Sequence, residues 1–453
     1  MDASIIIWMI GAAVMAVMLY TFIGFIPGTD ETSVLLPITL AIVLAGVEPM
    51  AVLSFFIAAI ITLNITNTMP TALVNLPGGV MSSAMIEHAI EIKKQGKSAQ
   101  IIKKMAAASA IGVIISVPLS LLLAFLLIPF AETIAPYSAY LFIVGAIFLS
   151  LISRAKVLSL FSIVPLAVLF MALRHLYWGL GVVDQDTTIT VSFFLGITIG
   201  PLLVSLFRLL NKKTFNDSLI KDKKNISIPK KDTTKYQKNP LKLLSKEERN
   251  NASVGAFLVN FFFVLSPVGL TILIGESFGK RFKEKLKRGF MSVTTMSAVV
   301  QATYISGIII PLLALGIPLS PVAIGPGNAL FVAGDVFSLD QNIHHLLSFS
   351  QFSIAVLIGA SIATMISYTL ITKYALPITK SILKYVPHEA VLGLFIAFIV
   401  LLAYIDAGFI NIFGVLLVGL VSGSLNKMGV NYGVQFMSLY AAPTLIEMIV
   451  GVM

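Results

Sequence analysis

Residues 50–79 read MAVLSFFIAAIITLNITNTMPTALVNLPGG, an apolar run of membrane length whose second half is interrupted by Asn, Thr, Pro and Gly. About 20 apolar residues are enough to cross a bilayer. Four of the five residues from Asn64 to Thr68 are polar, so we expect the chain to depart from regular helix there. At membrane depth, irregular backbone is tolerated only where protein covers it or where it lines a watery cavity. The stretch therefore predicts a membrane protein with a buried polar site.

The composition excludes a soluble protein. The 453 residues are 57% hydrophobic and 11% charged, whereas about 25% of the residues in soluble domains are charged. The chain has no Cys, which excludes disulfides and thiolate metal sites. The net charge of +10 is attributed to cytoplasmic loops, where membrane proteins concentrate Lys and Arg, so no nucleic-acid partner is expected.

Eight uninterrupted apolar runs predict ordinary spanning helices. They lie at residues 105–131, 137–152, 157–173, 188–209, 347–371, 387–404, 408–424 and 433–452. Two further apolar stretches, 4–80 and 253–320, contain Pro, Gly and polar residues, so their helices are expected to break inside the membrane. The fold class is an all-α polytopic membrane protein.

The basic residues give the orientation. Every Lys and Arg except Arg174 falls in a segment that can be cytoplasmic if the plain helices alternate direction, as the positive-inside rule requires. Both termini are then extracytoplasmic, in a multi-pass protein of the plasma membrane. Residues 253–275 have basic segments on both sides, which predicts a re-entrant hairpin that turns at Ser266-Pro267-Val268-Gly269.

The same order of features occurs twice. A broken segment, a loop, a second broken segment and four plain helices occupy residues 1–210 and again 252–453, and the basic segment 211–251 is read as a cytoplasmic linker. The loop at Glu48 has no Lys or Arg, whereas its counterpart at 280–288 is strongly basic, so the halves are predicted to be inverted repeats. Paired broken helices in inverted repeats are typical of secondary transporters with a midplane site. Two re-entrant loops would also suit a channel.

The broken segments supply the candidate substrate site. Unwound backbone and helix N-termini favour an anion such as a carboxylate, although isolated Ser and Thr also serve helix packing. The candidates in the first half are Gly24, Pro27, Gly28, Thr29, Asn64, Thr66, Asn67, Thr68, Asn75, Pro77, Gly78 and Gly79. Those in the second half are Ser266, Pro267, Gly269, Gln301, Thr303, Tyr304, Gly316, Pro318 and Ser320.

The coupling ion is expected to be sodium rather than a proton. We expect no acidic residue deep in an apolar run, and proton carriers usually need one. Neutral oxygens near Asn67, Thr68 and Thr303 could bind sodium instead. Asp30, Glu31 and Glu276 adjoin the breaks and are secondary candidates. The sequence contains no catalytic constellation, so neither an enzyme nor an organic cofactor is expected.

Several short motifs resemble a known family. Gly24-x-x-Pro27-Gly28, Leu35-Leu36-Pro37-Ile38-Thr39, Asn75-Leu76-Pro77-Gly78, Ser277-Phe278-Gly279-Lys280-Arg281 and the run 308–318 are similar to the TctA family, the large membrane subunit of tripartite tricarboxylate transporters. The resemblance implies an ion-driven importer of organic carboxylates. It also implies two partners, a small membrane subunit and an extracytoplasmic solute-binding protein. The alternative is an anion channel or a stand-alone carrier for another small solute. A second copy of the chain, in a homo-oligomer, is a further possible partner.

Overall fold

The computed structural model describes residues 3–26, 31–74, 78–183, 190–209, 237, 239–334, 336–385 and 388–451. The first half contains α1 (Ala3–Gly24), α2 (Glu31–Leu44), α3 (Pro49–Thr66), α4 (Thr68–Val74), α5 (Val80–Ser83), α6 (Ile86–Lys94), α7 (Ser98–Leu127), α8 (Ala131–Ile134), α9 (Ser138–Ile152), α10 (Lys156–Gly179) and α11 (Thr190–Leu209). The second half contains α13 (Lys246–Val259), α14 (Pro267–Gly279), α15 (Lys285–Ala314), α16 (Pro321–Ile324), α17 (Ile343–Leu346), α18 (Phe349–Tyr385), α19 (His388–Lys427) and α20 (Tyr432–Val450).

The all-α membrane fold is confirmed. Within the described residues, 8 helices are long and apolar enough to cross a membrane, including α1, α3 continued by α4, and α15. The plain runs predicted from sequence coincide with α7, α9, α10, α11, α18, α19 and α20. The runs 387–404 and 408–424 form one element, α19, which is kinked at Ala407 and Gly408. Gly408 has φ +73°, a conformation that glycine adopts far more easily than other residues.

Helices α3 and α15 form the centre of the molecule. In the apolar stretch that α3 and α4 share, 94% of the residues are buried, and in the apolar stretch of α15 all of them are. Helix α3 packs against α1 and α18, and α15 packs against α7, α13 and α14. Each central helix is therefore covered by helices from both halves of the chain.

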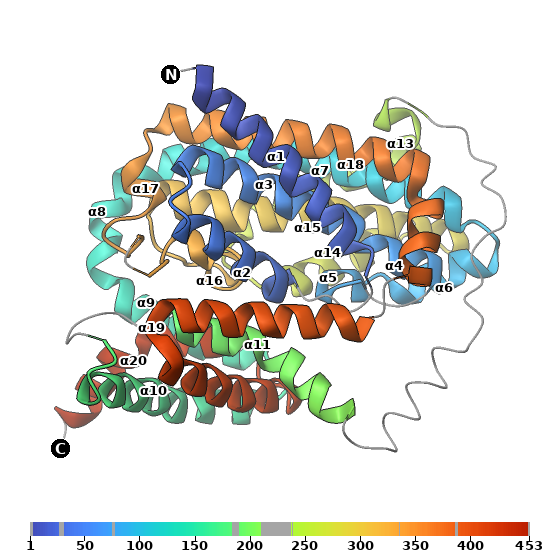
Figure 1. The fold of residues 1–453 in the computed structure, drawn as a ribbon. Helices are drawn as coiled ribbons and strands as arrows, with labels where there is room; N and C mark the ends of the chain where they lie inside the picture. Colours follow the sequence, from blue (N-terminus) through green and yellow to red (C-terminus); the bar gives the residue numbers. More distant parts are fainter. Residues whose placement is uncertain are drawn as a thin grey trace.

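A second layer lies beside this centre. Figure 1 shows α9, α10, α11, α19 and α20 together below the layer that contains α1, α3, α7, α15 and α18. Helix α20 packs against α9 and α10, and α11 packs along α19. In this view the first turn of α1 and the last turn of α20 both lie at the left, as do α8 and α17.

Four glycines bring α11 and α19 into backbone contact. Gly196 and Gly200 on α11 face Gly419 and Gly423 on α19. A Cβ on Gly200 would come within 2.7 Å of the Gly423 amide nitrogen and 2.9 Å of the Gly419 carbonyl oxygen. Small residues at four-residue spacing allow membrane helices to approach this closely. We call this contact the glycine seam.

Polar contacts also join the two halves. Lys104 on α7 donates to both carboxylate oxygens of Glu248 on α13, at 2.6 and 2.7 Å. Asn260 donates to Ser116 at 3.0 Å and accepts from Ser120 at 2.9 Å, which ties α7 to the turn after α13. The two halves are interlocked through these buried contacts.

The segment 253–275 forms a helical hairpin. Helix α13 begins at Lys246, the chain turns after Asn260, and α14 begins at Pro267 with Ser266 as its N-cap, accepting from the Gly269 amide at 3.3 Å. Both helices pack on α15. The turn lies next to the predicted break, and the re-entrant path through the membrane stays a prediction.

Candidate functional site

The end of α3 is packed against three glycines. A Cβ on Gly24 would overlap the Thr66 hydroxyl, one on Gly78 would overlap the Asn67 carbonyl, and one on Gly79 would overlap the Asn67 amide. The Thr66 hydroxyl donates to the Tyr20 carbonyl of α1 at 3.2 Å. The sequence-predicted residues Gly24, Thr66, Asn67, Gly78 and Gly79 therefore lie together, and the glycines are required for close packing.

Glu31 lies at the same point, contrary to the expectation that no acidic residue is buried deeply. The residue is only 2% exposed. Its carboxylate accepts hydrogen bonds from the Asn67 amide at 3.3 Å, the Val80 backbone at 3.1 Å and the Met81 backbone at 3.4 Å. Glu31 therefore joins the start of α2 to the end of α3 and to the start of α5.

Three buried amides near the centre have atoms without a hydrogen-bond partner among the described residues. They are both amide atoms of Asn64, Oδ1 of Asn67 and Oε1 of Gln301. All three residues are at most 3% exposed. Leaving a buried polar group unsatisfied costs about 1–3 kcal/mol, and native proteins rarely do so without a reason. Gln301 also donates to the Ile61 carbonyl at 3.1 Å, so it connects α15 to α3.

The break after α15 is capped by the loop that follows it. Gly316 has φ +66° and packs against the His344 ring. His344 donates to the Leu313 carbonyl at 2.9 Å and Asn342 donates to the Gly316 carbonyl at 2.9 Å. Burial lowers the pKa of His344, which favours the neutral ring. The loop thereby bonds the Leu313 carbonyl in the last turn of α15 and the Gly316 carbonyl just after the helix.

Ser320 and Pro318 belong to the same break, at residues 315–320. The Ser320 hydroxyl donates to the Gly307 carbonyl on α15 and accepts from the Ala323 amide at 3.0 Å, so Ser320 is the N-cap of α16. Pro318 lies between Gly316 and this cap. These bonds fix α16 against α15, beside the cavity described next.

A cavity of about 150 Å³ lies where elements of both halves meet. Among the sequence-predicted residues, it is lined by Ser266, Pro267 and Tyr304. Its other lining residues are Glu31, Thr32, Val80, Met81, Val268, Pro321, Val322, Gly325, Pro326, Asn431, Tyr432, Gly433 and Phe436. The cavity thus joins α2 and α5 of the first half to α14, α15, α16 and α20 of the second.

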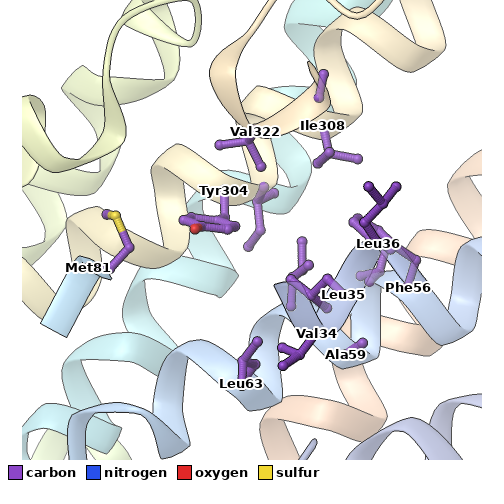
Figure 2. Close-up of a cluster of buried hydrophobic side chains, with 14 of the residues drawn as sticks. Val34, Leu35, Leu36, Phe56, Ala59, Leu63, Met81, Tyr304, Ile308 and Val322 are labelled. Carbon is purple, nitrogen blue, oxygen red and sulfur yellow. The ribbon is translucent and has the colours of Figure 1, made fainter. Parts of the chain in front are cut away.

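The apolar side chains next to the cavity also come from both halves. Figure 2 shows Tyr304 and Val322, from α15 and α16, facing Val34 and Leu35 of α2, with Met81 of α5 to one side. All five residues are buried. The polar groups of the cavity therefore lie beside a packed apolar centre, as is usual for small-molecule sites.

The start of α20 was not expected at this site. Asn431 is the N-cap of α20 and accepts from the Gly433 amide at 2.8 Å. The Asn-x-Gly spacing predicts a helix start, but only the fold places that start beside Tyr304 and Ser266 in the cavity wall.

The residues expected to bind sodium are bonded locally. Thr68 donates to the Ile65 carbonyl at 2.6 Å, and Thr303 donates to the Val300 carbonyl at 3.0 Å. In the described part of the chain, no three His, Asp or Glu side chains are grouped so that they could hold a metal ion. Sodium binding near Asn67, Thr68 and Thr303 stays a prediction. The candidates Pro27, Gly28, Thr29, Asn75 and Pro77 lie outside the described residues.

Glu276, the other described acidic candidate, is part of a different cluster. Its carboxylate bonds to His88 of α6 and accepts from Arg288 of α15 at 2.8 Å. Burial alone would raise the pKa of Glu276, but the hydrogen bonds and charges of His88 and Arg288 outweigh it and hold this pKa below its ordinary value. Glu276 therefore connects α6 of the first half to the hairpin of the second.

The sequence comparison identifies the family of the chain. The model of the tripartite tricarboxylate transporter TctA family matches residues 10–435, nearly the whole chain. The chain belongs to the TctA family. A TctA protein is a component of a tricarboxylate transporter, so this TctA member is a multi-pass membrane protein of a transport system. No curated protein and no solved structure matches the chain.

Proposed function

We propose that this TctA protein is an ion-coupled secondary transporter that imports small organic carboxylates by alternating access, with the cavity between α2, α14, α15 and α20 as its substrate site. The observation that carries the proposal is that this cavity is lined by elements next to the breaks of both halves. Glu31 follows the predicted break at residues 24–28, Ser266 begins the one at residues 266–269, and both residues line the cavity.

Reciprocal packing supports the inverted-repeat part of the proposal. Helix α3 packs with α18 of the other half, and its counterpart α15 packs with α7. Helix α1 packs with α3 and α18, as α13 packs with α15 and α7. Equivalent helices thus exchange partners across the halves, which is the expected result of a pseudo-two-fold relation between inverted repeats.

The unsatisfied amides support binding of a polar guest. Asn64, Asn67 and Gln301 are buried and retain unpartnered oxygens in the described structure, and oxygens of this kind suit sodium as well as the hydroxyl groups of a substrate. We propose sodium as the coupling ion, with a proton as the alternative carried by Glu31. The positions of the first turn of α1 and the last turn of α20 on one side of the molecule are consistent with two extracytoplasmic termini (Figure 1).

The family description supports partner subunits. The word tripartite in the family name leads us to propose a small membrane subunit and an extracytoplasmic solute-binding protein that delivers the substrate. Purified protein is therefore tested first for substrate binding, because the membrane subunit can bind its substrate without the solute-binding protein that delivers it. A ligand that binds the folded state raises its melting temperature.

The deciding experiment combines two measurements. Thermal-shift screening against organic acids, with and without sodium, identifies a ligand. Uptake of that labelled ligand into proteoliposomes then tests transport, with the partner subunits added in a parallel set. We expect saturable uptake that is driven by an ion gradient and supports counterflow. Flux without saturation or counterflow would show a channel, and no stabilisation by any organic acid would refute a carboxylate site.

A further inference from the structure

The wall of the cavity carries one formal charge among its described residues. Glu31 is acidic, and the remaining lining residues are neutral, with hydroxyl, amide or apolar side chains. Tyr304 and Ser266 supply hydroxyl groups and Asn431 supplies an amide on the side formed by the second half. The cavity is therefore electrostatically asymmetric, with its negative side formed by the first half.

The surroundings of Glu31 suit an ionised carboxylate. Its carboxylate accepts from an amide NH₂ and from two backbone N–H groups, and an ionised carboxylate is an acceptor only. Hydrogen bonds to a charged acceptor are also the stronger ones. Because Gly79 has no side chain, Glu31 and Asn67 can approach each other here, as a Cβ on Gly79 would overlap both. The position of the carboxylate is thus fixed by several independent contacts.

A fixed negative charge discriminates between anions. Like charges about 5 Å apart, at an effective dielectric constant of about 20, weaken binding on the order of a hundredfold. A second or third carboxylate on a substrate would meet this penalty on the side of α2, whereas an ammonium group there would gain a comparable attraction. One carboxylate can still be accommodated beside Ser266, Tyr304 and Asn431.

On the basis of the proposed function, we infer that Glu31 selects aminocarboxylates as the substrates of this cavity. The ammonium group of the substrate joins the amide donors around Glu31, and its single carboxylate faces Ser266 and Asn431 on the opposite wall. Glu31 is then a specificity-determining residue that excludes di- and tricarboxylates.

The test uses four small acids of four carbons that differ mainly in charge, together with the six-carbon tricarboxylate citrate. Purified full-length protein is titrated with 2-aminobutyrate, 4-aminobutyrate, butyrate, succinate and citrate, and the dissociation constants are measured by calorimetry. We expect one aminocarboxylate to bind at least tenfold more tightly than succinate, citrate and butyrate. Glu31→Gln keeps the shape of the side chain and removes its charge, so the preference should fall at least tenfold. Glu247→Gln, which removes an exposed carboxylate outside the cavity, should keep the preference.

Each outcome decides the matter. Tighter binding of succinate or citrate than of both aminocarboxylates by the wild type refutes the inference and leaves carboxylate transport standing. An unchanged preference in Glu31→Gln also refutes it, because the charge then has no role. If Glu31→Gln does not fold, the ranking of the probes by the wild type still decides. Failure of every carboxylate, in this panel and in the broader screen, refutes the proposed function itself.

Discussion

The ion pair between Lys104 and Glu248 gives the sharpest test of how the halves are held together. Glu248 is 2% exposed in its side chain and Lys104 is 14% exposed. Replacing Lys104 by Met leaves the more buried charge without its partner, and breaking a buried pair in this way typically costs about 3–5 kcal/mol. The Lys104 ammonium also lies 4.7 Å from the centre of the Phe290 ring, a contact worth about 0.5–1 kcal/mol. We therefore expect Lys104→Met to lower the free energy of unfolding by about 4 kcal/mol.

Removing the charge from the other partner should cost less. In Glu248→Gln the side chain still accepts from the Ser245 backbone, a bond of 2.7 Å in the wild type, because Gln also serves in a capping box. The ammonium left behind can reach water along its flexible stem, so about 1–2 kcal/mol is expected. The double variant removes both charges and should cost less than the sum of the two.

Equilibrium unfolding in detergent, followed by circular dichroism, measures these differences. The control is Lys94→Met, which breaks an exposed pair with Glu91 at 3.8 Å and should cost at most about 1 kcal/mol. Two results would show that burial of the carboxylate does not govern this contact. One is a loss of unfolding free energy in Glu248→Gln as large as that in Lys104→Met. The other is a loss in the double variant equal to the sum of the two single losses.

Three further predictions concern the site and its surroundings. Gly24→Ala should destabilise the protein by about 1–3 kcal/mol through overpacking, whereas Gly11→Ala on the same helix, with nothing within 4 Å, should be neutral or slightly stabilising in the same unfolding assay. Asn64→Leu should leave the unfolding free energy unchanged or higher while the binding of sodium, proposed for the unsatisfied amides, falls at least tenfold. Asn260→Leu, which removes a fully bonded amide, should instead lower stability by about 2–4 kcal/mol; equal stability losses in these two variants would contradict a binding role for Asn64. The folded-state pKa of Glu276 lies below its ordinary value of 4.5. The ionised carboxylate therefore contributes fully to the unfolding free energy above about pH 4.5, and this contribution is lost as the pH falls through the lower, folded-state pKa. Between pH 7 and pH 3, the melting temperature should therefore fall less steeply for Glu276→Gln than for the wild type.

Much of the fold could be predicted from hydropathy and local backbone chemistry. The apolar runs identified α7, α10, α18 and α20, since a helix that faces lipid must be apolar over its full length. Pro and Gly marked the positions where α14 begins and where the chain leaves α15. The sequence predicted two helices at 387–404 and 408–424, and the structure has one element, α19, with a kink at Ala407 and Gly408 between them.

The site was less predictable because its contacts are distant in sequence. Glu31 is buried by Asn67, Val80 and Met81, which lie 36, 49 and 50 residues away, and no local pattern signals such a contact. Thr68 and Thr303 matched the pattern of a binding residue, yet each hydroxyl donates to the carbonyl three residues earlier in the chain. A Ser or Thr hydroxyl in a membrane helix can always donate to a backbone carbonyl three or four residues earlier. Only the fold decides whether the hydroxyl makes that bond or binds a distant group.

The glycine seam limits which parts of the molecule can slide. Where Gly200 and Gly423 bring two backbones into contact, a side chain at either position would overlap the facing main chain. If the protein works by the alternating access proposed above, we expect α11 and the part of α19 after its kink to keep this contact and to move together. Since α11 belongs to the first half of the chain and α19 to the second, the moving parts would then not be the two sequence halves.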